Sequence, residues 1–163
     1  MILGSGYAGT VVANKLAREF RREIARGELN VTILDKTDVN INQGGFTFIP
    51  FGLYTPEDLK RPRKEVLSPR INCVFGENGE STKVDLENRK VQVKSGNTFN
   101  YDYLVIATGS TTDVNKVPGL VDDFNTFYTS MDDAFKLKEK INNFDQGRIA
   151  ISVAQMPVSC PGA

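Results

Sequence analysis

The chain has 163 residues, of which 40% are hydrophobic and 25% charged, a composition typical of a globular domain with a buried core. Its 20 basic and 20 acidic side chains balance, so the sequence offers no basic surface for nucleic acid. Histidine is absent, which excludes a histidine-ligated metal and a Ser–His or Cys–His catalytic pair, and we expect no metal. No stretch reaches the roughly 18 apolar residues of a membrane span, and no secretory signal pattern opens the chain.

A glycine-rich turn follows the first predicted strand, Met1–Leu3, and precedes a predicted helix with one apolar face. In this context the three glycines of a GxGxxG turn allow a tight bend, close approach of a pyrophosphate and close helix–strand packing. Free N–H groups at the helix start favour the phosphates. The predicted dinucleotide-binding residues are Gly4, Gly6, Tyr7, Ala8 and Gly9.

The second predicted strand, Val31–Leu34, ends at Asp35. A carboxylate there can accept hydrogen bonds from ribose hydroxyls, and it would repel the 2′-phosphate of NADP. Asp35 is therefore predicted to bind the ribose of the dinucleotide. Glycines and prolines then recur from Asn40 to Arg70, which predicts loops and short helices rather than sheet.

A short strand is predicted at Ile71–Phe75, followed by a β-meander. Its antiparallel strands Lys83–Leu86 and Lys90–Lys94 flank a turn at Glu87-Asn88, and a second turn follows at Ser95-Gly96-Asn97. The continuous apolar run Tyr103–Ala107 is typical of a buried parallel strand.

The last part of the chain contains one predicted helix and one predicted strand. Ser130 is a predicted helix N-cap, with Asp133 three residues later as its capping-box partner. The apolar segment Arg148–Val153 is the predicted strand.

The βαβ start, the meander and the segment Tyr101–Gly109 together resemble the two-dinucleotide flavoproteins, which include the glutathione-reductase-like enzymes. The resemblance implies FAD as the cofactor, with the Ala-Thr-Gly turn closing over it near the pyrophosphate. It also implies adenosine, isoalloxazine and adenine contacts from the loops around the sheet. The residues implied in these roles are Ala107, Thr108 and Gly109 in the turn, Lys36 at the ribose, Gln43 and Gly44 at the ring, and Ser81 at adenine.

The predicted fold class is α/β with two domains. Residues 1–112 would form a Rossmann-like FAD-binding domain with a parallel sheet and an antiparallel β-meander. Residues 113–163 would supply a linker, a helix and the first strand of a second Rossmann-like unit. The short first strand and the end of the chain directly after an apolar strand are read as signs of the N-terminal part of a longer protein.

The segment Val153–Pro157 stands where relatives that use NADH or NADPH carry a second glycine fingerprint. It contains no glycine, and Pro157 has no N–H with which to bind phosphate. The sequence that follows, from Pro157 to Ala163, resembles the sulfide:quinone oxidoreductases and flavocytochrome c sulfide dehydrogenases. That resemblance implies a catalytic Cys160 that reaches the flavin and handles sulfur, with a second cysteine from a C-terminal part that this sequence lacks. The alternative for Cys160 is a small buried apolar residue.

Two departures from the family favour a two-cysteine quinone reductase with noncovalently bound FAD. Many sulfide:quinone oxidoreductases carry a further cysteine where this chain has Tyr128-Thr129-Ser130. Flavocytochrome c members attach FAD to a cysteine in the loop that here reads Asn42–Gly45, which has none. Cys73, inside a predicted strand, is interpreted as a core residue.

We therefore expect an FAD-dependent oxidoreductase that oxidises sulfide and reduces a quinone. Peripheral membrane contact would come from the absent C-terminal region, with the protein otherwise cytoplasmic, and the sequence leaves a homo-oligomer open. One alternative is an enzyme like the type II NADH:quinone dehydrogenases, which needs a nucleotide site that Val153–Pro157 does not provide. The other is a flavin-binding fragment without turnover.

Overall fold

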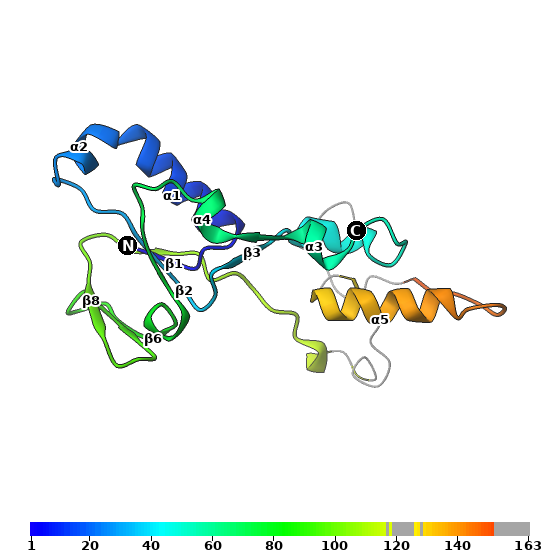
Figure 1. The fold of residues 1–163 in the computed structure, drawn as a ribbon. Coiled ribbons are helices and arrows are strands. Elements are labelled where there is room, and N and C mark those ends of the chain that lie inside the picture. Colours follow the sequence, from blue (N-terminus) through cyan, green and yellow to red (C-terminus); the bar gives the residue numbers. More distant parts are fainter. Residues whose placement is uncertain (117, 119–125, 128, 152–163) are drawn as a thin grey trace. The chain divides into compact units, whose positions relative to one another are not determined.

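The structure is a computed structural model, and it describes residues 1–116, 118, 126–127 and 129–151 (Figure 1). The chain divides into two units. The first consists of Met1–Asn42 and Pro56–Ser110, and the second of Gln43–Thr55 and Thr111–Ala163. The domain boundary expected after residue 112 stays a prediction.

A four-stranded parallel sheet forms the centre of the first unit. Its strands are β1 (Ile2–Leu3), β2 (Thr32–Asp35), β5 (Asn72–Phe75) and β9 (Val105–Ile106), in the spatial order β5-β2-β1-β9. Ile2 of β1 lies in register with Ile33 on one side and Val105 on the other. This is the strand order of one half of a Rossmann fold, so the predicted α/β class is confirmed.

Helix α1 (Tyr7–Glu19) packs on one face of this sheet. Its residues Ala13 and Ala17 are buried against Ile2 and Ile33, and their small side chains allow the helix to lie close to the strands. The long connection to β2 contains another helix, the short α2 (Arg21–Ala25), which the sequence does not predict. The predicted helix after the glycine turn is confirmed.

The predicted β-meander covers the other face of the sheet (Figure 1). It consists of β6 (Ser81–Asp85), β7 (Lys90–Val93) and β8 (Thr98–Asn100), paired antiparallel in that order. Val91 and Val93 of β7 are buried against Leu3 and Leu34, the neighbours in sequence of the residues that face α1. Alternate residues of β1 and β2 therefore contribute to two separate cores, as the period of a strand requires.

The segment between β2 and β5 was predicted to contain no sheet, and this was wrong in part. β3 (Val39–Ile41) and β4 (Lys60–Pro62) form an antiparallel ribbon. All three residues of β4 are exposed, so the sequence has no alternation of apolar and polar residues there to indicate a strand. The predicted short helices are present, as η1 (Gln43–Phe48), α3 (Pro56–Leu59) and α4 (Arg63–Val66).

The apolar run Tyr103–Ala107 does form a parallel strand, but the prediction of a buried one was wrong. Only Val105 and Ile106 are in β9, and this strand lies at the edge of the sheet with β1 as its neighbour. Tyr103 is 83% exposed and Ile106 is 64% exposed. An edge strand has a neighbour on one side only, whereas a continuous apolar run is typical of a strand inside the sheet.

The described part of the second unit contains η1, η3 (Val114–Lys116) and α5 (Met131–Asn142). The predicted capping box is confirmed, since the N–H of Asp133 donates to the hydroxyl of Ser130 at 3.1 Å. The predicted strand Arg148–Val153 is not, because residues 148–151 form no strand and the remainder lies outside the described residues. A strand needs a partner for its backbone N–H and C=O groups, and the described part of this unit offers none.

Across the described ranges, the structure contains no helix long and apolar enough to span a membrane. It also brings together no group of three or more side chains suited to bind a metal there.

Gly79 provides a test of the packing at the end of β2. A Cβ atom at this position would overlap the carbonyl oxygens of Val74 and Asp35. Both are backbone atoms, so Gly79→Ala must displace the ends of two sheet strands. We expect it to lower the free energy of unfolding by about 1–3 kcal/mol in chemical denaturation. The exposed neighbour Glu77 is the control, and Glu77→Ala is expected to change it by less than about 0.5 kcal/mol. Equal effects would contradict this packing.

Candidate functional site

The glycine turn lies at the carboxyl edge of the parallel sheet. Gly4 has a φ of +89°, a conformation that glycine adopts without strain, and its N–H donates to the carbonyl of Leu34 at 2.8 Å. A Cβ on Gly4 would overlap the carbonyl oxygen of Ala107 and lie 3.0 Å from the Cα of Thr108. The fold thus brings the glycine turn and the Ala-Thr-Gly turn together, although about a hundred residues separate them in the sequence.

The two other glycines of the turn differ in their surroundings. A Cβ on Gly9 would overlap the carbonyl oxygen of Gly4, so this glycine is needed for close packing of the helix on the strand. Gly6 has no atom within 4 Å of the same position, and it caps α1 without a side-chain hydrogen bond. Tyr7 and Ala8 follow it on the surface, with Tyr7 89% exposed. The turn therefore leaves open space beside the helix N-terminus, where a pyrophosphate fits the N–H groups and the helix dipole.

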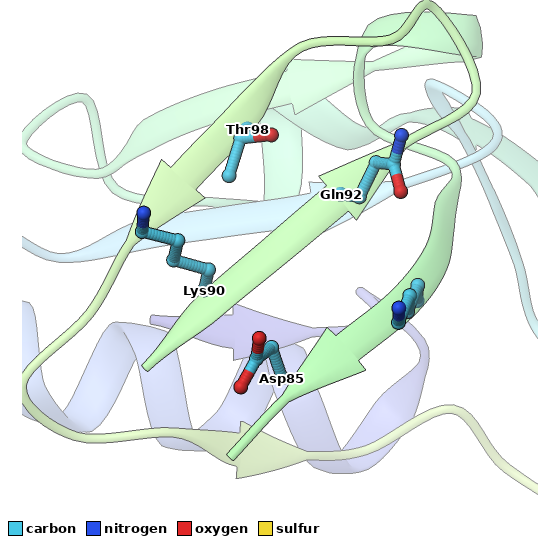
Figure 2. A pocket seen from close by; sticks show the side chains of 5 residues that line it. Asp85, Lys90, Gln92 and Thr98 are labelled. Carbon is cyan, nitrogen blue, oxygen red and sulfur yellow. The ribbon is translucent and has the colours of Figure 1, made fainter. Parts of the chain in front are cut away.

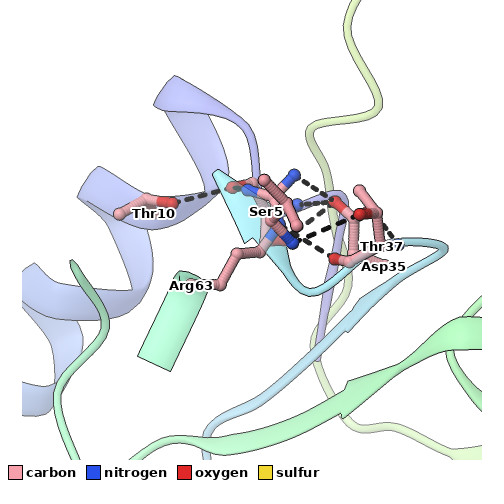
Figure 3. A network of polar contacts seen from close by, with 6 residues as sticks. Ser5, Thr10, Asp35, Thr37 and Arg63 are labelled. Atoms are coloured by element: carbon pink, nitrogen blue, oxygen red, sulfur yellow. Dashed lines mark hydrogen bonds and ion pairs between the residues drawn. The ribbon is translucent and has the colours of Figure 1, made fainter. Parts of the chain in front are cut away.

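Asp35, at the end of β2, is bound to the glycine turn (Figure 3). Its Oδ2 accepts hydrogen bonds from the N–H of Ser5 at 2.6 Å and from the hydroxyl of Ser5 at 2.8 Å. Its Oδ1 accepts from the N–H of Thr37 at 3.1 Å. The side chain is 12% exposed. Asp35 therefore lies at the predicted strand end with both carboxylate oxygens hydrogen-bonded within the protein, Oδ2 twice and Oδ1 once, and its ribose contact stays a prediction.

Arg63, the first residue of α4, is a site residue that the sequence alone does not indicate. Its side chain is 8% exposed, and its Nη2 lies 3.5 Å from Oδ2 of Asp35. Burial lowers the pKa of the Arg63 guanidinium, while the charges of Asp35 and Asp38 act in the opposite direction. In the sequence Arg63 stands in the run Lys60–Lys64, which has the composition of a solvated surface and gives no signal of burial.

The roles of the other residues predicted to contact FAD stay predictions. Lys36 is exposed just after Asp35, Thr108 and Gly109 are exposed after β9, and Ser81 is half-buried at the start of β6. Gln43 and Gly44 are exposed in η1, which belongs to the second unit.

The two cysteines differ in what the structure describes. Cys160 and the segment Val153–Pro157 lie outside the described residues. Cys73 is half-buried in β5, its thiol contacts the carbonyl of Ile71 at 3.5 Å, and burial raises the thiol pKa. A protonated, half-buried thiol agrees with the interpretation of Cys73 as a core residue.

A hollow on the meander shares none of its lining residues with the site residues named above (Figure 2). The residues that line it are polar or charged and come from the three strands β6, β7 and β8. The lining residues are Lys83, Asp85, Lys90, Gln92 and Thr98. Lys90 and Gln92 alternate along β7 with the buried Val91 and Val93, so the hollow belongs to the solvent face of the meander.

Comparison with known proteins identifies the family of the chain. The sequence model of the pyridine nucleotide-disulphide oxidoreductase family matches residues 1–152. The chain is 29% identical over 123 residues to the type II NADH:quinone oxidoreductase of Staphylococcus saprophyticus, covering 75% of this chain and 29% of that protein. It is 27% identical over 168 residues to the mitochondrial sulfide:quinone oxidoreductase of Dictyostelium discoideum, covering 100% of this chain and 35% of that protein.

Among solved structures, the sulfide:quinone oxidoreductase of Aquifex aeolicus has the same fold over 86% of this chain and 30% of that one. The TM-score is 0.68 and the sequence identity 21%. The chain thus spans about a third of the length of the proteins it matches. The family match covers nearly the whole chain, and the glycine turn leaves room for a pyrophosphate beside an acidic strand end. The chain therefore belongs to the pyridine nucleotide-disulphide oxidoreductase family, and its cofactor is FAD.

Proposed function

We propose that this protein is an FAD-dependent sulfide:quinone oxidoreductase, or the FAD-binding part of one. The observation that carries the proposal is the sequence after Ile151. The segment Val153–Pro157 lacks the glycines that a second dinucleotide site requires, and Cys160 lies three residues after it. Both lie outside the described residues, so this step rests on the sequence.

The glycine turn and the strand ends around it would hold the ADP half of FAD. The N–H groups of Gly6, Tyr7 and Ala8 would bind the pyrophosphate, and Asp35 would accept a hydrogen bond from the ribose. Ala107, Thr108 and Gly109 would close over the pyrophosphate from the neighbouring turn. Lys36 and Ser81 would contact adenosine, and Gln43 and Gly44 would pass the isoalloxazine ring. Bound FAD supplies the transfer of two electrons between sulfide and the quinone.

Cys160 would handle the sulfur together with a second cysteine, which this sequence does not contain. Hydrosulfide attacks the disulfide between them, so that a new S–S bond forms at Cys160 while the disulfide bond breaks. The electron pair of the broken bond would leave on the second cysteine as a thiolate, and bound FAD would supply the two-electron acceptor. In total, hydrosulfide, one proton and a quinone give zero-valent sulfur and a quinol.

A quinone acceptor is supported by the similarity to relatives that are named as quinone oxidoreductases, one with NADH and one with sulfide as the other substrate. The quinones that such oxidoreductases reduce reside in membranes. The proposal therefore includes peripheral association with the membrane, with the protein otherwise cytoplasmic.

The second candidate is a type II NADH:quinone oxidoreductase. It is favoured by the 29% identity to the staphylococcal enzyme, and that alignment covers 75% of this chain. This function requires a binding site for NADH, and the sequence Val153–Pro157 lacks the glycine turn that usually forms one. The third is a flavin-binding module without turnover.

Reduction of the bound flavin distinguishes the three candidates. We expect sulfide to bleach the flavin absorbance rapidly in anaerobic stopped-flow measurements, and NADH to leave it unchanged. Rapid bleaching by NADH alone would contradict the proposal and favour the second candidate. A stable flavin spectrum with both reductants would favour the module without turnover.

Substitution of Cys160 tests its role in the full-length enzyme. We expect Cys160→Ser to reduce the rate of sulfide-dependent quinone reduction by about 100-fold or more while the FAD content stays the same, because a serine hydroxyl cannot form a persulfide. Cys73→Ala is the matched control, and it should retain activity because Cys73 is part of the core. Unchanged activity of Cys160→Ser would remove the sulfur-handling role.

A further inference from the structure

Arg63 is a charged residue that is only 7% exposed, which places it among the buried residues of the described part of the chain. Its guanidinium donates one hydrogen bond from Nη1 to the carbonyl of Ser5 and another from Nε to the carbonyl of Thr37, the latter at 3.0 Å. Its own backbone N–H donates to the carbonyl of Asp38 at 2.7 Å. These contacts fix the side chain between the glycine turn and the end of β2 (Figure 3).

With its orientation fixed by two carbonyls, Arg63 directs its third nitrogen, Nη2, at Asp35. Its Nη2 lies 3.5 Å from Oδ2, the oxygen that also accepts both hydrogen bonds from Ser5. A carboxylate oxygen accepts about two hydrogen bonds. Oδ2 is therefore saturated, and Asp35 cannot turn it toward a ligand without breaking contacts to both Ser5 and Arg63.

The other oxygen of Asp35 has capacity left. Oδ1 accepts from the N–H of Thr37 at 3.1 Å, the one bond to it among the described residues. One acceptor position therefore remains on Oδ1. The protein thus engages Oδ2 of the carboxylate fully and leaves one acceptor position on Oδ1 for a ligand hydroxyl.

A guanidinium suits this arrangement, whereas an ammonium does not. The three acceptors of Arg63 are the carbonyls of Ser5 and Thr37 and the carboxylate of Asp35, and each binds a different nitrogen of one planar group. A lysine would supply the same charge from a single nitrogen on a flexible stem. It could neutralise Asp35 but could not contact all three groups from three separate nitrogens.

We propose that Arg63 is a positioning residue for the ADP half of FAD, which holds the Asp35 carboxylate so that Oδ1 meets a ribose hydroxyl. Arg63 acts through Asp35 and does not touch the ligand. The proposal rests on FAD binding at the glycine turn, and it does not depend on sulfide or quinone as substrates.

The test measures how strongly the FAD-free protein distinguishes ADP from 2′,3′-dideoxy-ADP, which lacks both ribose hydroxyls. Affinities come from calorimetry or from competition with FAD, so no turnover is needed. We expect the wild-type protein to prefer ADP by about tenfold or more, the usual contribution of a hydrogen bond to a charged group. In Arg63→Lys this preference should fall to about twofold or less, while the affinity for dideoxy-ADP changes little.

The neighbouring Arg61 is the matched control. It is exposed, and its guanidinium donates to the carbonyls of Glu57 and Lys60. Arg61→Lys should keep the wild-type preference for ADP. If Arg63→Lys lowers the affinities for ADP and dideoxy-ADP equally, Arg63 only supports the glycine turn and the proposal is wrong.

A second variant covers the case in which Arg63→Lys does not fold, as judged by circular dichroism and thermal melting. Ser5→Ala removes the hydroxyl that binds Oδ2 but keeps the backbone N–H and carbonyl of the turn. Ser5→Ala should lower the preference for ADP by about threefold, because Oδ2 then loses one of its hydrogen-bond donors. A preference that stays at the wild-type value in Ser5→Ala would also overturn the proposal.

If FAD binds tightly but shows no reaction with sulfide, the proposed function fails and the role of Arg63 is still tested. If sulfide reacts as proposed but the ribose preference is insensitive to Arg63, only the role of Arg63 fails. The two results are therefore separable.

Discussion

The first unit depends on one close backbone approach, that of the glycine turn to the ends of two neighbouring strands. Gly4 donates its N–H to Leu34 of β2 and has the carbonyl of Ala107, just after β9, where a side chain would otherwise be. Any Cβ at Gly4 would force β1 and β9 apart. Because parallel strands all end at the same edge of their sheet, this approach brings the glycine turn, Asp35 and the Ala-Thr-Gly turn to one place.

The sheet between these loops is short but is covered on both faces. Ile2 and Ile33 pack under α1, while Leu3 and Leu34 pack under the meander, so single residues of β1 and β2 alternate between two cores. A slip of one residue in register would exchange the two sets and bring Gly4 out of place. The two cores therefore fix the register that the binding edge requires.

Local signals account for what the sequence predicts well. The glycine turn, the two turns of the meander and the capping box of α5 are each specified by residues a few positions apart, and all are present in the structure. The features that were missed depend on distant partners. Arg63 looks like part of an exposed basic run, and only the folded chain places it against Ser5 and Asp35. Likewise, the exposure of Ile106 follows from the edge position of β9, and no neighbouring residue indicates that position.

We propose that this chain binds one dinucleotide, at Gly4–Gly9, and receives its electrons without a nicotinamide nucleotide. The decisive measurement is a calorimetric titration of the FAD-loaded full-length protein with NADH. We expect one tightly bound FAD per chain and no saturable binding of NADH. Saturable binding of NADH that leaves the FAD in place would show a second dinucleotide site and would contradict the proposal.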